Sequence, residues 1–164
     1  MNGVNLFIKP IKVEMKILEK QTDFYPSYRM HIHIEVEHPT GKATYSASDI
    51  WFDVVSWNAF INNMRKDDIT NTFSIALLDM SELFKLELIN NGNEYIMTLQ
   101  ISEPETGFGT FDMILSYIID REIYDKIKEA FIENAPELHQ LKQQNQTYST
   151  KPSSNEGDNN WCFV

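Results

Sequence analysis

Apolar and polar residues alternate through the first third of the chain. The alternation runs over residues 11–17 and again over residues 30–36, with charged side chains at the intervening positions. A period of two places the apolar side chains on one face of a strand and the polar ones on the other. The pattern therefore predicts half-buried antiparallel strands. The sequence Pro-Thr-Gly-Lys at 39–42 then predicts a turn into a third strand near 43–52.

The period changes after Asp53. Apolar residues follow at positions 54, 57, 60, 61 and 64, which is the spacing of one helix face. An aspartate just before such a stretch is a favourable N-cap. Arg65 and Lys66 suit the C-terminal end of a helix, where positive charge is favoured. The sequence therefore predicts a helix between Asp53 and Lys66.

Strand patterns resume in the second half of the chain and lead to a second helix. Strands are predicted at 73–78, 83–89, 95–101 and 111–119, and Asn90-Asn91-Gly92-Asn93 is the clearest turn signal. Asp120 is a candidate N-cap. The helix after it has an apolar stripe of Ile123, Ile127, Ala130 and Phe131. Pro136 marks its end or a restart.

This order of elements predicts the α+β class. We expect a curved, mostly antiparallel sheet of six to eight strands with two helices on one face. Residues 1–142 would form a single domain. Residues 143–164 are dominated by Gln, Asn, Ser and Thr, and such a segment cannot bury enough apolar surface to offset its ordering entropy. We therefore expect a disordered polar tail.

The composition of the chain limits its cellular compartment and its capacity for disulfide bonds. The 164 residues contain one cysteine, Cys162, which argues against a disulfide framework. The N-terminus has neither the basic nor the apolar region of a signal peptide, and no stretch approaches the ~20 apolar residues that span a bilayer. We expect a cytoplasmic protein that does not bind membranes.

The charge is strongly segregated along the chain. The net charge is −10; residues 43–136 hold six basic and sixteen acidic residues, a net −10, while the flanking segments contribute +1 and −1. Such a field repels phosphate backbones and attracts basic surfaces. The sequence therefore predicts a protein partner with a basic surface and no nucleic-acid binding.

Carboxylates at strand and loop ends of the acidic segment are the candidate partner-binding residues. Phe108, in a glycine-containing loop, could add an exposed apolar contact. The candidates are Asp49, Asp67, Asp68, Asp79, Glu82, Glu103, Glu105 and Phe108. Helix caps and solvated turn residues are the alternative interpretation of such carboxylates. The cluster Trp51, Phe52 and Trp57 is likewise either an interface anchor or part of the core.

No catalytic motif stands out, and we expect neither catalysis nor a cofactor. The one exception to weigh is a metal site. His31 and His33 share the polar face of a predicted strand, and paired imidazoles can chelate a metal. A metal-dependent enzyme would use His31, His33 and nearby carboxylates, but three ligands are normally needed and no distant histidine stands in a recognisable second position. Histidines on a solvated strand face are the alternative, and no metal site is predicted.

The layout of the chain resembles the small bacterial immunity proteins of wall-associated polymorphic toxin systems. The resemblance covers about residues 10–136, from the alternating strands through Ser48-Asp49-Ile50-Trp51-Phe52-Asp53, the first helix and the later meander to the second helix. It implies a non-enzymatic cytoplasmic antidote that binds its cognate toxin domain, which is a nuclease in many such systems. The alternatives are a generic protein-interaction module and, less favoured, the metal-dependent enzyme or a small-molecule carrier.

Overall fold

The computed structural model describes residues 3–66, 72–103 and 111–133. These residues form eight strands and two helices. In chain order they are β1 (Gly3–Ile8), β2 (Ile11–Gln21), β3 (Ser27–His38), β4 (Gly41–Asp53), α1 (Val54–Lys66), β5 (Phe73–Leu78), β6 (Phe84–Asn90), β7 (Tyr95–Glu103), β8 (Phe111–Ile119) and α2 (Arg121–Glu133). The predicted tail at 143–164 and the predicted domain end at 142 lie outside the described residues.

The strands form two antiparallel sheets of four, and in each sheet consecutive strands are neighbours. The orders are β1-β2-β3-β4 and β5-β6-β7-β8. Each sheet is followed in the chain by a helix of 13 residues. The predicted α+β class is confirmed, as are its antiparallel strands and two helices. The eight strands are divided between two sheets rather than joined in one.

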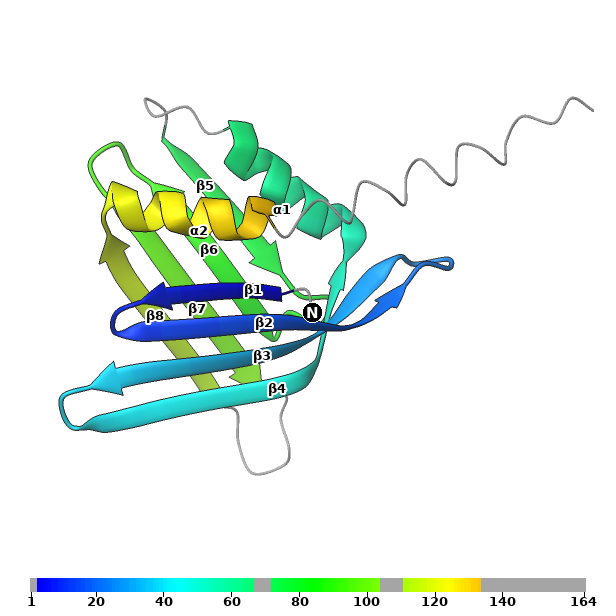
Figure 1. The fold of residues 1–164 in the computed structure, drawn as a ribbon, viewed down its shortest axis with the longest axis horizontal. Helices are drawn as coiled ribbons and strands as arrows, with labels where there is room; N and C mark the ends of the chain where they lie inside the picture. Colours follow the sequence, from blue (N-terminus) through cyan, green and yellow to red (C-terminus); the bar gives the residue numbers. More distant parts are fainter. Residues whose placement is uncertain (1–2, 67–71, 104–110, 134–164) are drawn as a thin grey trace, which may run out of the picture.

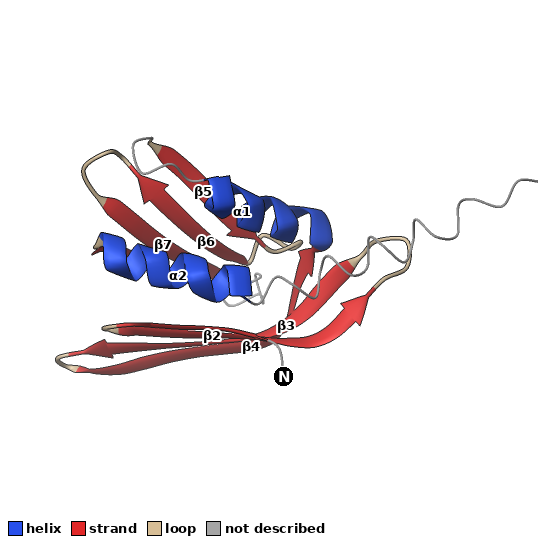
Figure 2. Ribbon diagram, turned by 45° about the horizontal axis from the view of Figure 1, so that its top comes forward, coloured by secondary structure: helices blue, strands red, loops and turns tan. Residues whose placement is uncertain are grey.

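The two sheets cross at a large angle, and both helices lie on the same side of the second sheet (Figures 1 and 2). Helix α1 packs against β5, and α2 packs against β1 and α1. Each helix therefore packs on a strand from the other half of the chain. The alternating apolar residues of both sheets face this shared interior, where they are almost fully buried.

Aromatic rings connect the two halves within the core. Phe52 at the end of β4 lies 5.8 Å from Trp57 of α1 and 5.9 Å from Phe84 of β6, measured between ring centroids. Phe131 of α2 lies 5.8 Å from Trp57 and 5.1 Å from Phe60. Tilted and edge-on pairs at these distances add to the stabilisation that burial gives. Phe52 and Trp57 are therefore core residues, as the second interpretation of their cluster proposed.

Both predicted helix caps are confirmed. The Asp53 carboxylate accepts a hydrogen bond from the backbone N–H of Ser56 at 2.8 Å. The Asp120 carboxylate accepts one from the backbone N–H of Ile123, also at 2.8 Å. Each cap satisfies a backbone donor that has no partner inside its helix.

The predicted turn between β6 and β7 is also confirmed. The side chain of Asn90 accepts a hydrogen bond from the backbone N–H of Gly92, and that of Asn91 accepts from Asn93 and Glu94. Gly92 has a φ of 92°, a conformation that residues with a Cβ rarely adopt.

Neither α1 nor α2 is long and apolar enough to cross a lipid bilayer, and the described residues contain no other helix.

Candidate functional site

Strand β4 meets the β5–β6 turn at one end of the second sheet. The backbone N–H of Met80 donates to the carbonyl of Trp51 at 2.7 Å, and Ser102 of β7 donates to the carbonyl of Leu83 at 2.7 Å. These bonds join three segments that are far apart in the sequence. They bring together three of the predicted partner-binding residues, which we call the anionic corner: Asp49, Asp79 and Glu82.

Asp79 holds the turn itself. Its side chain is buried, with 3% of the residue surface exposed. One carboxylate oxygen accepts from the backbone N–H of Phe84 at 2.7 Å, and the other accepts from Ser81 at 3.1 Å. Burial of a carboxylate is tolerated when hydrogen bonds of this kind satisfy it. The side chain is thus occupied within the fold, which supports the turn-residue alternative for this position.

Asp49 and Glu82 are exposed at the same corner. The Asp49 carboxylate accepts a hydrogen bond from the indole N–H of Trp51 at 3.1 Å, which holds the ring beside it. Glu82 has a φ of 59°, so the turn places it in the left-handed region. Its carboxylate is exposed in the turn that Met80 joins to Trp51 of β4.

Apolar surface lies beside these carboxylates. Trp51 is half-buried, and the guanidinium of Arg29 lies 5.9 Å from its ring centroid. Met80 is 54% exposed and Leu78 is 37% exposed. Tryptophan, methionine and arginine are enriched at protein interfaces. Sequence reasoning missed Met80 and Leu78, because only the hydrogen bond between Met80 and Trp51 shows that their segment adjoins β4.

The remaining predicted residues are placed less fully. Glu103 ends β7, where its backbone pairs with Phe111 of β8. The other four predicted partner-binding residues lie outside the described part of the chain: Asp67, Asp68, Glu105 and Phe108.

The described residues retain the acidic excess. Between residues 43 and 133, with 67–71 and 104–110 left out, thirteen acidic and six basic residues give a net charge of −7. Among these cations, Lys85 pairs with Glu87, Arg121 with Asp125, and Lys126 with Glu122. The sequence patterns do not predict a further acidic surface that the structure shows on α2. There Asp125, Glu129 and Glu133 line a shallow groove together with Lys128 and Ile132.

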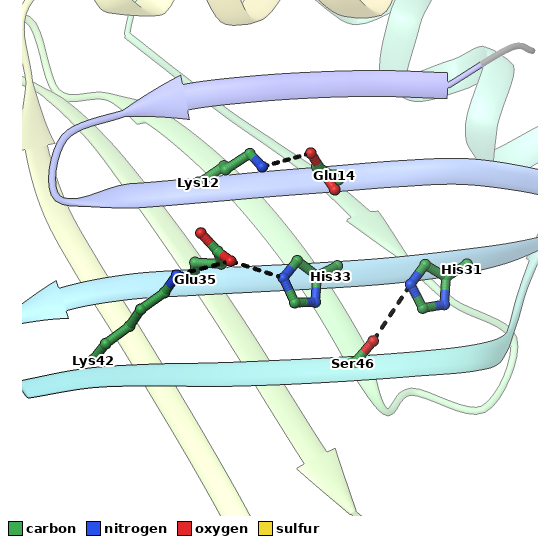
Figure 3. A network of polar contacts seen from close by, with 7 residues as sticks. All are labelled: Lys12, Glu14, His31, His33, Glu35, Lys42 and Ser46. Atoms are coloured by element: carbon green, nitrogen blue, oxygen red, sulfur yellow. Dashed lines mark hydrogen bonds and ion pairs between the residues drawn. The ribbon is translucent and has the colours of Figure 1, made fainter.

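The outer face of the first sheet carries a polar network that contains both candidate metal ligands (Figure 3). His31 lies 2.8 Å from the hydroxyl of Ser48 through Nδ1. His33 lies 3.2 Å from a carboxylate oxygen of Glu35 through Nε2. The two imidazoles therefore contact different partners. No group of three or more His, Cys, Asp or Glu side chains in the described ranges is arranged to hold a metal ion.

Glu35 links two strands within this network. The ammonium of Lys42 lies 2.9 Å from its carboxylate. Hydrogen bonds from Lys42 and then from His33 lower the pKa of Glu35 below its usual value. Lys12 and Glu14 form a neighbouring pair at 2.7 Å. Such exposed pairs keep the outer face of the first sheet solvated and contribute little to stability.

Comparison with known proteins does not assign a function to this chain, so the geometry described above is the main guide to it. Neither a protein-family model nor a curated protein matches the chain. Among solved structures, the chain is similar to one described as the structure of the plant transcriptional regulator PBF-2. The similarity has a TM-score of 0.44 at 12% sequence identity, and it covers 93% of this chain and 89% of that chain. A similarity at this level assigns neither a family nor a function.

Proposed function

We propose that this protein is a non-enzymatic, acidic binding protein that acts as an immunity-type inhibitor in the cytoplasm. Its partner would be a cognate bacterial toxin domain with a basic surface, such as a nuclease. The observation that carries the proposal is the anionic corner. There the exposed carboxylate of Asp49 accepts a hydrogen bond from Trp51, and the turn with the exposed Met80 and Glu82 is hydrogen-bonded to Trp51.

Charge supports fast association with such a partner. The described residues from 43 onward keep a net charge of −7. Complementary potentials steer two proteins together and raise the association rate well above that of neutral pairs. An acidic protein that covers a basic cleft also competes with the nucleic acid that the cleft would bind. Inhibition then requires binding alone, with no chemistry on the part of the inhibitor.

The apolar part of the corner supports a stable complex. Charged residues at the rim of an interface affect mainly the association rate, whereas buried aromatic and aliphatic anchors slow dissociation. Trp51 is held in place by Asp49 and Arg29, so little side-chain entropy is lost when a partner covers it. Met80 offers a flexible, polarizable side chain beside it.

The direct test is affinity capture of the toxin domain encoded next to this gene. We expect a complex at low salt with wild-type protein. Asp49→Lys and Glu82→Lys should each lower the affinity by about tenfold or more, since both reverse a charge that faces the partner. The matched control is Glu94→Lys, which makes the same change at an exposed position in the turn at the opposite end of β6.

Two results would overturn the proposal. One is the absence of any complex with the adjacent toxin at low salt. The other is an equal loss of affinity for Glu82→Lys and Glu94→Lys, which would reduce the effect to net charge. A complex with an unrelated host protein through the same corner would instead support the alternative of a generic interaction module.

A further inference from the structure

The eighth strand has one strand neighbour within the residues that the structure describes. Strand β8 pairs with β7 in an unbroken antiparallel register from Glu103↔Phe111 to Tyr95↔Ile119. It is the last strand of its sheet, so its other edge presents a row of backbone donors and acceptors. Such an edge is a template for pairing with another strand.

Soluble proteins normally protect their edge strands, and the other three edges here show such protection. Strand β1 has six residues and packs against α2, and β5 has six residues and packs against α1. Strand β4 carries a register shift, which distorts its pairing, and Lys42 near its start. Short length, coverage, bulges and lysines are all devices that prevent edge pairing.

Within the described part of the chain, strand β8 has none of these devices. It spans nine residues without lysine, arginine or proline and without a register shift. Its outer face exposes two large apolar side chains, Ile114 at 64% and Ile118 at 69%. On its inner face, Met113, Leu115 and Tyr117 are only partly buried. An apolar and regular edge of this kind is expected to be covered in the native protein.

The sequence of β8 is complementary to itself. When two copies pair antiparallel about a two-fold axis at Ser116, Ile114 of each copy lies opposite Ile118 of the other. On the inner face, Leu115 then faces Tyr117. Two-fold pairing requires one surface to match itself, and cross-strand apolar pairs of this kind stabilise antiparallel sheets.

The same register extends an apolar row that already exists on the second sheet of each copy. Ile118 lies beside Ile96 of β7, and Ile96 lies beside Ile89 of β6. Placing Ile114 of the second copy next to Ile118 continues this row across the two-fold axis. The edge strand and the outer face of the sheet thus fit the same arrangement.

We infer that the protein forms a homodimer through antiparallel pairing of β8 with β8 of a second copy, giving one continuous eight-stranded sheet. Asp112 and Asp120 limit the pairing at its ends. Asp112 starts the outer row as an exposed carboxylate, and Asp120 lies just beyond the strand as the cap of α2. In this register Asp112 of each copy lies opposite Asp120 of the other, so like-charge repulsion ends the pairing there and confines it to the residues between them.

Light scattering coupled to size-exclusion chromatography tests the oligomeric state of the full chain. We expect twice the 19.2 kDa of one chain. Ile114→Lys should return the mass to that of a monomer, because it places a charge in the joint apolar row. Val55→Lys is the matched control, since Val55 is an apolar residue on α1 with 78% of its surface exposed, and it should remain dimeric. Circular dichroism checks that both variants are folded.

A cysteine placed on the two-fold axis tests the register. Facing Cα atoms in an antiparallel pair are about 4.5–5.5 Å apart, which a disulfide can bridge. Ser116→Cys combined with Cys162→Ala should give a covalent dimer on oxidation, whereas Ser74→Cys in the same background should not, because Ser74 lies on β5 at the other edge. A monomeric wild-type protein at every concentration would overturn the inference. So would an intramolecular disulfide to Cys162 in the single variant Ser116→Cys, which keeps Cys162, because it would mean that the chain's own C-terminal segment covers β8.

Discussion

Aspartate side chains at strand ends stabilise this fold by accepting backbone hydrogen bonds. Asp53 and Asp120 cap the helices, and Asp79 holds the β5–β6 turn with both carboxylate oxygens. All three follow or end an apolar strand, so their local sequences look alike. Sequence reasoning identified both caps because a helical period follows them. It could not foresee that Asp79 is buried, because that depends on the contact of the turn with β4.

Removing the Asp79 carboxylate should destabilise the protein. In Asp79→Ala, the backbone N–H of Phe84 loses its acceptor in a buried turn, and an unsatisfied buried donor costs about 1–3 kcal/mol. Urea unfolding followed by circular dichroism measures the loss. Glu94→Ala, in the exposed β6–β7 turn, should stay within about 0.5 kcal/mol of wild type. Equal stability of Asp79→Ala and wild type would contradict the structural role of this side chain.

Glu87 should make part of the stability depend on pH. Its carboxylate lies 2.8 Å from Lys85 and 2.9 Å from the hydroxyl of Ser74. The hydrogen bond from Lys85 chiefly lowers the pKa of Glu87 in the folded state, against an opposing effect of desolvation. The lowered pKa stabilises the fold at pH values above the ordinary pKa of about 4.5, and this stabilisation is lost as the pH falls through the folded-state value.

The Glu87→Gln variant tests this dependence. It should lose less than about 1 kcal/mol at neutral pH, because the pair is near the surface. It should also lose less stability than wild type when the pH is lowered from 7 to about 3, since it has no carboxylate to protonate there. Unfolding curves at the two pH values give the comparison, with Glu94→Gln as the control. Parallel losses for Glu87→Gln and wild type would show that other carboxylates account for the acid sensitivity.

At the scale of elements, the period of the apolar residues identified most strands and both helices. The predicted strand at 73–78 and the predicted helix after Asp53 agree with the observed β5 and α1. Strand β1 was not assigned separately, because its six residues contain a short alternation only. The division into two sheets was also missed. Alternation shows which face of a strand is buried, but it does not show that β4 and β5 belong to different sheets.

The same limit applied to the candidate site. Charge and position predict Asp49 and Glu82 as site residues, and the structure places both on the exposed surface of one corner. The same criteria do not predict the neighbouring Met80. A methionine in a turn gives no signal in the sequence, and its relevance follows from the hydrogen bond that joins the turn to Trp51. Long-range contacts of this kind are what local patterns cannot supply.

The cap of α2 should be worth about as much as N-caps in other proteins. Asp120→Ala removes the acceptor for the backbone N–H of Ile123 and should cost about 1 kcal/mol. Asp120→Asn keeps an acceptor and should recover most of that loss. Thermal unfolding of the two variants makes the comparison. If both were destabilised equally, the negative charge rather than the hydrogen bond would be the stabilising element.

At the scale of the whole molecule, the net charge of −10 acts on the two proposed associations with opposite sign. Binding of a basic toxin domain is attractive at long range, so its rate should fall as the ionic strength rises. Pairing of two identical acidic chains is repulsive at long range, so the homodimer should become more stable as salt screens that repulsion.

Salt titration therefore separates the two associations in one preparation. Sedimentation velocity of the protein alone should show more dimer at 0.5 M than at about 0.05 M NaCl, while capture of the toxin domain should slow over the same range. A dimer that dissociates on addition of salt would contradict pairing through the apolar β8 edge. Toxin capture that is insensitive to salt would contradict recognition by carboxylates.

Each helix packs on a strand from the other half of the chain, and this packing has a consequence for biosynthesis. Residues 3–66 are translated before the strand that receives α1 and before the helix that packs on β1. Until translation reaches Glu133, the nascent polypeptide therefore carries apolar surface that only its remainder can cover. Synthesis of this protein should accordingly depend on chaperones that shield the first half, and fragments truncated after α1 should be rapidly degraded in the cell.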